Sequence, residues 1–149
     1  MRPLTLLLTV AATVALMCGY GVPVAAEDDN GGAFIAPADG VVAFYFHGNV
    51  RCATCRKIEA WADKAIHSGF AEALDDGALT WSVVNIDAPP NRHFVEDFQL
   101  TTRSVVLAEY RDGRVVRSKN LDKVWQLVRS EDDFTDYIQA ETTTFLEHS

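Results

Sequence analysis

The sequence predicts a single α/β domain, and three observations support this prediction. An apolar run of strand length, Val41–Phe46, is rich in β-branched and aromatic residues. A helical pattern follows, in which apolar residues recur every three or four positions between Cys55 and Ile66. Strand and helix patterns then alternate to the end of the 149-residue chain. A chain of this length fits one domain with a core of its own.

The first residues, 1–26, are expected to form a secretory signal peptide. Arg2 gives a positive start, Leu4–Met17 is apolar and uncharged, and small residues precede an acidic stretch. We therefore expect cleavage after Ala26 and a secreted protein that works in the periplasm or another extracytoplasmic space. Two alternatives remain open: an uncleaved membrane anchor, for which the segment is short, and a lipoprotein acylated at Cys18.

Residues 27–40 contain two adjacent glycines and a proline, so we expect a flexible lead-in to a domain at 41–149. The whole chain has a net charge of −8. This charge argues against nucleic acid or an anionic membrane surface as a partner. Once the leader is removed, no stable membrane insertion is expected.

The two cysteines of a C-x-x-C motif, Cys52 and Cys55, lie at the junction between the first predicted strand and the first predicted helix. The strand ends at the glycine-containing segment His47–Asn49. The first turn of a helix presents unpaired N–H groups and the positive end of the helix dipole, which stabilise a thiolate. Cys52 is therefore the predicted nucleophile. Cys55, one turn deeper, is predicted to resolve a mixed disulfide formed on Cys52.

Basic residues flank this motif and favour redox chemistry. Arg51, Arg56 and Lys57 are expected to hold the pKa of the Cys52 thiol below that of a free cysteine. A structural disulfide and one half of a zinc site are the alternative interpretations. A structural zinc site usually takes four protein ligands, and the sequence has no second C-x-x-C motif.

A second strand and a second helix are predicted next. Leu79–Ile86 has strand character and is ended by Asp87–Pro90. Asn91–Gln99 is a short helix candidate with an apolar face, and Asn91 is its predicted N-cap.

The last part of the chain predicts a β-hairpin and two helices. Ser104–Tyr110 and Arg114–Arg117 flank Asp112-Gly113, a dipeptide typical of tight hairpin turns. Helical patterns follow over 121–128 and 134–145. The resulting order, β-α-β-α-β-β-α with an extra C-terminal helix, places the cysteines at the carboxyl end of the first strand, where open α/β sheets usually hold their sites.

With these residues in place, the chain resembles a thioredoxin-like protein over most of 41–146. More narrowly, four segments are similar to the family named nitrophenyl compound nitroreductase subunit. They are Phe44–Asn49, Arg56–Glu59, Val84–Asp87 and Thr102–Leu107. The resemblance implies a thioredoxin-like three-layer α/β/α sandwich. It also implies that, in nitroreduction, the cysteines relay electrons.

The function that this resemblance and the motif imply is that of an extracytoplasmic thiol–disulfide oxidoreductase or electron-relay subunit. Its expected partner is a protein dithiol or disulfide, or a membrane electron donor. No flavin or nicotinamide is expected, because the sequence has no glycine-rich dinucleotide fingerprint. The expected redox group is the Cys52–Cys55 disulfide.

The sequence departs from ordinary thioredoxins in the loop that faces the cysteines. Their cis-proline is replaced here by Val105 or Val106, which favours a trans peptide bond. Together with Arg51, Arg103 and Ser104, these valines are expected to line a substrate groove. Arg103 is expected to steer an acidic partner or to stabilise a thiolate, with a solvated role as the alternative.

A second departure is the absence of a buried acidic residue on the first strand. His47, at the end of that strand, is the predicted proton acceptor, with a surface role as the alternative. A different function also remains open, in which Cys52, Cys55 and His47 bind copper, zinc or trivalent arsenic without turnover. Thiolates are soft ligands that select such ions.

Overall fold

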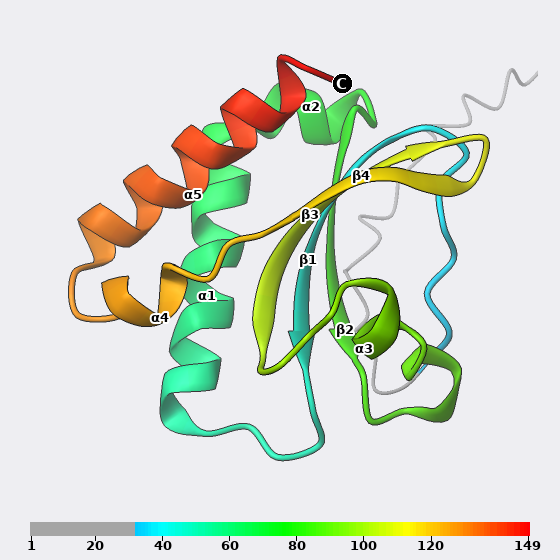
Figure 1. Cartoon of the computed structure of the whole chain (residues 1–149). Coiled ribbons are helices and arrows are strands. Elements are labelled where there is room, and N and C mark those ends of the chain that lie inside the picture. Colours follow the sequence, from blue (N-terminus) through cyan, green and yellow to red (C-terminus); the bar gives the residue numbers. More distant parts are fainter. Residues whose placement is uncertain (1–31) are drawn as a thin grey trace, which may run out of the picture.

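The computed structural model describes residues 32–149 (Figure 1). The elements, in chain order, are β1 (Gly40–His47), α1 (Ala53–Gly69), α2 (Ala71–Asp75), β2 (Leu79–Asn85), the 3₁₀ turn η1 (Pro89–Asn91), α3 (Phe94–Asp97), β3 (Ser104–Arg111), β4 (Arg114–Asn120), α4 (Val124–Leu127) and α5 (Glu131–Leu146). The expected signal peptide, with Cys18, lies outside the described residues.

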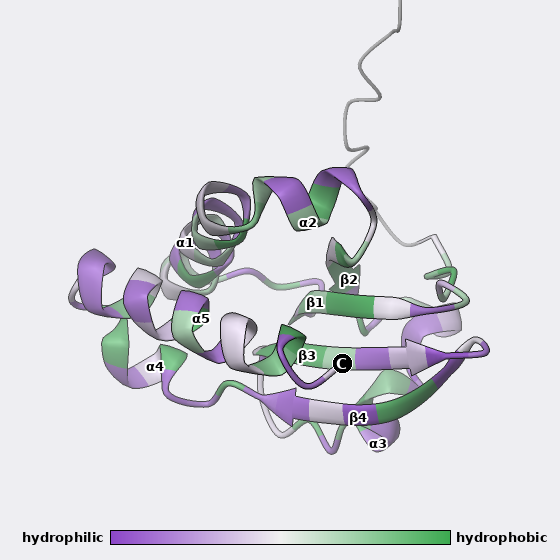
Figure 2. Ribbon diagram, turned by 90° about the horizontal axis from the view of Figure 1, so that it is seen from above, coloured by the Kyte–Doolittle hydropathy of each residue, from purple (hydrophilic) through white to green (hydrophobic). Residues whose placement is uncertain are grey.

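The four strands form one mixed sheet in the order β2-β1-β3-β4. β1 pairs in parallel with β2 and antiparallel with β3, and β4 pairs antiparallel with β3. Helix α1 makes the crossover that two consecutive parallel strands require. Helices α1, α4 and α5 lie on one face of the sheet and α3 lies on the other (Figures 1 and 2). The α/β sandwich expected from the sequence is confirmed.

β1 is the central strand, and its two faces belong to two apolar cores. Because successive strand residues point to opposite faces, Tyr45 and its alternate neighbours pack with α1 and α5. Phe44 and its alternate neighbours pack with α3. Burial on both faces explains why the strand reads as one continuous apolar run in the sequence.

The two long helices begin at side chains that accept a backbone hydrogen bond. The Sγ atom of Cys52, the N-cap of α1, accepts from the N–H of Cys55. Ser130 Oγ, the N-cap of α5, accepts from the N–H of Asp133. Each cap satisfies one of the N–H groups that a helix leaves unpaired in its first turn.

The predicted hairpin forms between β3 and β4. Asp112 and Gly113 both adopt positive φ angles, of 51° and 72°. A two-residue turn with this backbone matches the twist of the flanking strands. The hairpin forms where it was expected, but β3 ends at Arg111 and not at Tyr110, and β4 continues past Arg117 to Asn120.

Two expectations on the shorter helices were wrong. α3 covers only Phe94–Asp97, and Asn91 is not its N-cap. The Asn91 side chain is buried, donates to the carbonyl oxygens of Gly32 and Asn85, and accepts from the N–H of Phe34. These contacts with other segments take the side chain away from the helix.

The helical pattern at 121–128 yields only the single turn of α4, because the chain turns at 128–130 toward α5. α2, which follows α1 directly, was not predicted.

Part of the expected lead-in, residues 32–39, lies before β1 within the described residues. These residues form no helix or strand, and Phe34 among them packs against the second apolar core. The ring of Phe34 lies 4.8 Å from that of Phe44 and 5.8 Å from that of Phe94, as measured between ring centroids. Aromatic contacts of this kind hold this part of the lead-in against the core.

β4 is an edge strand with two exposed apolar side chains, Val115 at 42% exposure and Val116 at 57%. Its register with β3 shifts between Glu109 and Tyr110. None of the helices in 32–149 has the length and apolar character needed to cross a membrane.

Candidate redox site

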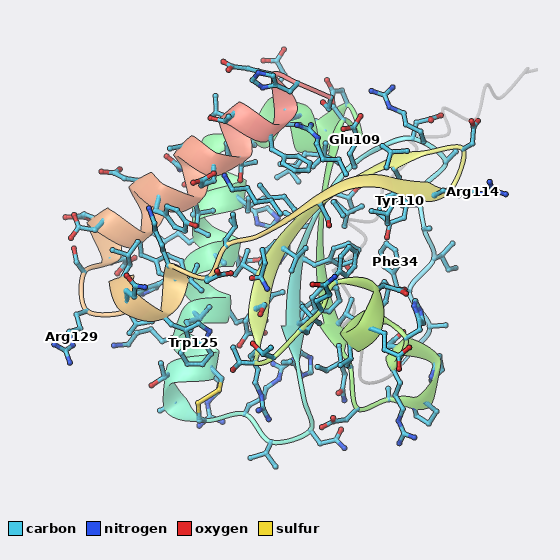
Figure 3. The ribbon with its side chains drawn as sticks, viewed as in Figure 1. Phe34, Glu109, Tyr110, Arg114, Trp125 and Arg129 are labelled. Atoms are coloured by element: carbon cyan, nitrogen blue, oxygen red, sulfur yellow. A yellow bond between two sulfur atoms is a disulfide. The ribbon has the colours of Figure 1, made fainter. Side chains whose placement is uncertain are left out.

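Cys52 and Cys55 form a disulfide at the N-terminal end of α1, with their Cα atoms 5.0 Å apart (Figure 3). Cys52 is exposed, whereas Cys55 is buried at 4% exposure. The Sγ atom of Cys52 lies 3.1 Å from the backbone nitrogen of Cys55, which donates to it. One sulfur is therefore open to a partner and capped by a helix N–H, while the other is covered.

Arg51, the residue before Cys52, is the middle member of a row of three polar side chains. The Nη1 atom of Arg51 lies 3.0 and 2.9 Å from the two carboxylate oxygens of Glu59, on the second turn of α1. The Nη2 atom of the same guanidinium contacts Nε2 of His47, at the end of β1. Arg51, next to Cys52 in the chain, is thus held from both sides.

His47 has donors and acceptors on both sides of its ring. Nδ1 lies 2.9 Å from the carbonyl oxygen of Gly48, which only accepts, and 3.2 Å from Nε of Arg51, which only donates, while Nε2 contacts Nη2 of Arg51. The two closer contacts are both satisfied when Nδ1 donates to Gly48 and Nε2 accepts from Arg51. Burial, together with the positive charge of Arg51, lowers the pKa of His47, although the Gly48 carbonyl opposes the shift. His47 is therefore neutral at neutral pH, with both ring nitrogens engaged.

The structure does not bring His47 to the cysteines as a third ligand. Within residues 32–149, no group of three His, Cys, Asp or Glu side chains lies close enough together to hold a metal ion. The ligand set expected for the metal-binding alternative is therefore not assembled in this arrangement.

Tyr45 contacts the backbone of Cys55, and the sequence analysis missed this contact. Its hydroxyl donates to the carbonyl oxygen of Cys55 at 2.8 Å, inside the core. Burial and the nearby charge of Glu59 raise the pKa of Tyr45 to about 12, so the phenol stays protonated and remains a donor. The alternation of side chains along the strand was the available signal. It places Tyr45 in the core, and a buried tyrosine hydroxyl usually needs a hydrogen-bond partner.

Arg103 connects the loop before β3 to the loop before Cys52. Its Nη2 atom donates to the carbonyl oxygen of Val50 at 3.3 Å. Its own carbonyl oxygen accepts from the indole nitrogen of Trp125 at 2.9 Å. Figure 3 shows Trp125 at the same end of the molecule as the disulfide. Arg103 is thus brought to the site, as the sequence predicts.

The other residues expected to line a groove are placed differently. Val105 and Val106 are fully buried within β3, one on each face of the sheet. Their side chains therefore belong to the two cores and cannot line an open groove, which corrects the expectation. Ser104 is also buried, but it borders a small pocket of about 60 Å³. The lining residues of this pocket are Thr101, Thr102, Ser104, Asn120, Asp122, Val124 and Trp125.

Glu59 is the other residue that the sequence analysis missed. It lies four positions after Cys55 and therefore on the same side of α1. A carboxylate one turn behind a buried cysteine was the signal that could have indicated its place in the site.

Comparison with known proteins gives fold-level likenesses only. No family model matches the chain, and no curated protein does. Among solved structures, the first two thioredoxin domains of Naumovozyma dairenensis Eps1p are 20% identical, with a TM-score of 0.44, over 68% of this chain and 34% of that chain. The chain therefore spans about a third of that structure.

Two single thioredoxins are similar at a comparable level. Chlamydomonas reinhardtii thioredoxin f2 is 17% identical, with a TM-score of 0.36, over 61% of this chain and 78% of that one. Malassezia sympodialis thioredoxin (Mala s 13) is 14% identical, with a TM-score of 0.38, over 68% and 80%. The strand order β2-β1-β3-β4 and a disulfide after the central strand, rather than these superpositions, give the chain its thioredoxin-like fold.

Proposed function

We propose that this protein is a thiol–disulfide oxidoreductase whose working group is the Cys52–Cys55 pair. The observation that carries the proposal is the asymmetry of the disulfide. Cys52 is exposed and lies at the N-terminus of α1, whereas Cys55 is buried. An exposed sulfur that can become a stabilised thiolate is the one that a partner can reach.

In the reducing direction, the Cys52 thiolate attacks one sulfur of a partner disulfide. A mixed disulfide forms, and the other partner sulfur leaves as a thiolate that takes up a proton. The Cys55 thiolate then attacks the Sγ atom of Cys52 and displaces the second partner thiolate. The partner gains two electrons and two protons, and the Cys52–Cys55 disulfide found in the structure is restored. Oxidation of a partner dithiol runs through the same steps in reverse.

The polar side chains beside the disulfide have positioning roles in this proposal. His47 and Glu59 hold the Arg51 guanidinium next to Cys52, where its charge favours the thiolate over the thiol. His47 acts through Arg51 and not as a proton acceptor, because both of its ring nitrogens are engaged. Arg103 contributes a further positive charge from the opposite loop.

The setting of this chemistry is also part of the proposal. The apolar segment expected to be a signal peptide supports an extracytoplasmic protein, in which a protein dithiol or a membrane electron donor returns electrons to Cys52 and Cys55. The similarity of four segments to the nitrophenyl compound nitroreductase subunit family supports an electron-relay role. Intact-mass measurement of the exported protein tests the location through the expected cleavage after Ala26.

Insulin reduction by a dithiol donor tests the activity directly. Wild-type protein should accelerate the precipitation of insulin chains. Cys52→Ser should abolish the acceleration, because the remaining thiol, Cys55, is buried and out of reach of a partner. Cys55→Ser is the matched variant. It keeps Cys52, so it should accumulate a mixed disulfide with insulin that is visible by mass spectrometry.

The contrary outcome is also measurable. A wild-type rate equal to that of Cys52→Ser would exclude the oxidoreductase. Metal analysis after anaerobic purification completes the experiment, because stoichiometric copper, zinc or arsenic in an inactive protein would support a binding function instead.

A further inference from the structure

The disulfide of this acidic protein is surrounded by basic side chains. We call Arg51, Arg56, Lys57 and Arg103 the cationic rim. Three of them flank the cysteines in the chain, and Arg103 reaches the loop before Cys52 through its bond to the Val50 carbonyl. The whole chain has a net charge of −8. The charge at the redox site is therefore opposite in sign to that of the protein as a whole.

Two members of the rim are available to a partner. Arg56 and Lys57 are exposed, and neither forms an ion pair within the described residues. Lys57 lies over the ring of Trp61 and only 3.5 Å from the Val128 carbonyl oxygen, contacts that leave its charge uncompensated.

Several cations elsewhere are paired. Lys64, Arg117 and Lys119 each meet a carboxylate, of Glu131, Glu109 and Glu141 respectively.

Acidic side chains compensate the positive charges of only two members of the cationic rim, Arg51 and Arg103. Glu59 pairs with Arg51. The carboxylate of Asp87 accepts a hydrogen bond from the N–H of Asn49. This carboxylate and the Arg103 guanidinium both lie next to Gly48, so the two charges are close together. The two positive charges of Arg56 and Lys57 remain, and at physiological ionic strength a charge acts over about 8 Å.

Helix stability does not explain where these two cations lie. The positive end of a helix dipole favours acidic residues, by about 0.3–1 kcal/mol each. Helix α5 follows this rule, with Glu131, Asp132 and Asp133 in its first turn. Helix α1 has no acidic residue in its first turn, which contains Arg56 and is followed directly by Lys57. The preference of a helix N-terminus for acidic residues is therefore followed in α5 but not in α1, where the redox site lies.

We propose that the cationic rim selects protein partners whose cysteine is flanked by Asp or Glu residues. This inference rests on the proposed function and names its substrate class. Opposite charge around two reactive groups raises their encounter rate and fixes their relative orientation. A partner with basic residues at the same place is repelled by Arg56 and Lys57.

Three synthetic peptides with the same small disulfide loop test this selection. The residues on each side of the loop are Asp in the first, Asn in the second and Lys in the third. At low ionic strength, reduced wild-type protein should react fastest with the Asp peptide and slowest with the Lys peptide. We expect a ratio of at least about tenfold, the lower end of electrostatic steering. High salt should bring the three rates together.

Charge variants test whether the cationic rim causes the difference in rate among the peptides. Arg56→Glu with Lys57→Glu should reverse the order of the peptides. Arg56→Gln with Lys57→Gln should abolish it, and this milder pair serves if the first does not fold. The matched control is Arg114→Glu, since Arg114 is exposed and lies at the opposite end of the molecule from the disulfide (Figure 3). It should keep the wild-type order.

The outcomes separate the two proposals. Equal rates for the three peptides at low salt, or an order unchanged in the Gln variant, would overturn the acidic partner and leave the oxidoreductase in place. No exchange with the neutral Asn peptide would overturn the oxidoreductase itself.

Discussion

Tyr45 is a polar side chain inside a fully buried strand, and its hydrogen bond to the Cys55 carbonyl connects the sheet to the redox helix. Tyr45→Phe should lower the free energy of unfolding by about 1 kcal/mol, the net contribution of a typical hydrogen bond. Urea unfolding of the oxidised protein measures the change. Tyr110→Phe is the control, because this tyrosine is equally buried but its hydroxyl has no hydrogen-bond partner within the described residues. Equal losses in both variants would contradict the role given to Tyr45.

His47 makes the stability of the protein dependent on pH. Its pKa in the folded state is lowered from 6.5 by burial, so below that pH the unfolded chain binds more protons than the folded one. The stabilisation is complete above about pH 6.5 and decreases as the pH falls toward the folded-state pKa. Unfolding free energies measured between pH 5 and 8 should therefore fall more in wild type than in His47→Gln. Parallel curves would show that His47 does not titrate in this way. The exposed histidines His67, His93 and His148 are common to both proteins.

At the scale of elements, two arginines around the buried carboxylate of Glu109 connect α5 to the hairpin. The Glu109 carboxylate accepts from Nε of Arg111 and Nε of Arg117, both at 3.0 Å. Arg117 also donates to the Phe145 carbonyl oxygen at 2.7 Å and lies over the Phe145 ring. One side chain therefore contacts β3 and the end of α5.

Arg117→Met should lower the unfolding free energy by about 2 kcal/mol, since Glu109 loses a charged partner while buried. Arg114→Met, on the same strand, should change it by less than about 0.5 kcal/mol, because Arg114 is exposed and unpaired within the described residues. Thermal or urea unfolding of both variants compares them. A loss as small in Arg117→Met as in Arg114→Met would mean that the cluster contributes nothing.

Long, strongly patterned elements were predictable from the sequence, and short ones were not. The β1 run, α1, α5 and the Asp-Gly hairpin each have a periodicity or a turn dipeptide that fixes their type. The helices α2, α3 and α4 have four or five residues each, too few for a period to be read. Asn91 shows the same limit, because its side chain is used by segments distant in the chain.

The residues of the candidate site also fall into those that the sequence could reveal and those that it could not. The C-x-x-C pair and its flanking cations lie within a few residues, so the sequence was enough to find them. The contacts of Tyr45, Glu59 and Trp125 depend on how β1, α1 and the loop before β3 come together. Val105 and Val106 were misplaced although the start of β3 at Ser104 was predicted. Both lie in an inner strand that is buried on both faces of the sheet, so neither side chain is left for a groove.

At the scale of the whole molecule, Phe34 of the lead-in adds to the apolar core between the sheet and α3. Phe34 packs against the face of the sheet that the short α3 covers only in part. Phe34→Ala should lower the unfolding free energy by about 2 kcal/mol, less than a fully buried phenylalanine would. Ile35→Ala is the neighbouring control, at 88% exposure, and should be neutral. Similar unfolding midpoints for the two variants would show that the lead-in does not contribute to the core.

The open edge of the sheet has a consequence for solubility. Val115 and Val116 on β4 offer an apolar strand to which a second molecule could add. Charged side chains, Arg114, Arg117 and Lys119, are interspersed along the same strand, and charged side chains on an edge strand disfavour the addition of another strand. The register shift opposite β4 also bends the ladder. These features disfavour the association of two molecules through their β4 edges.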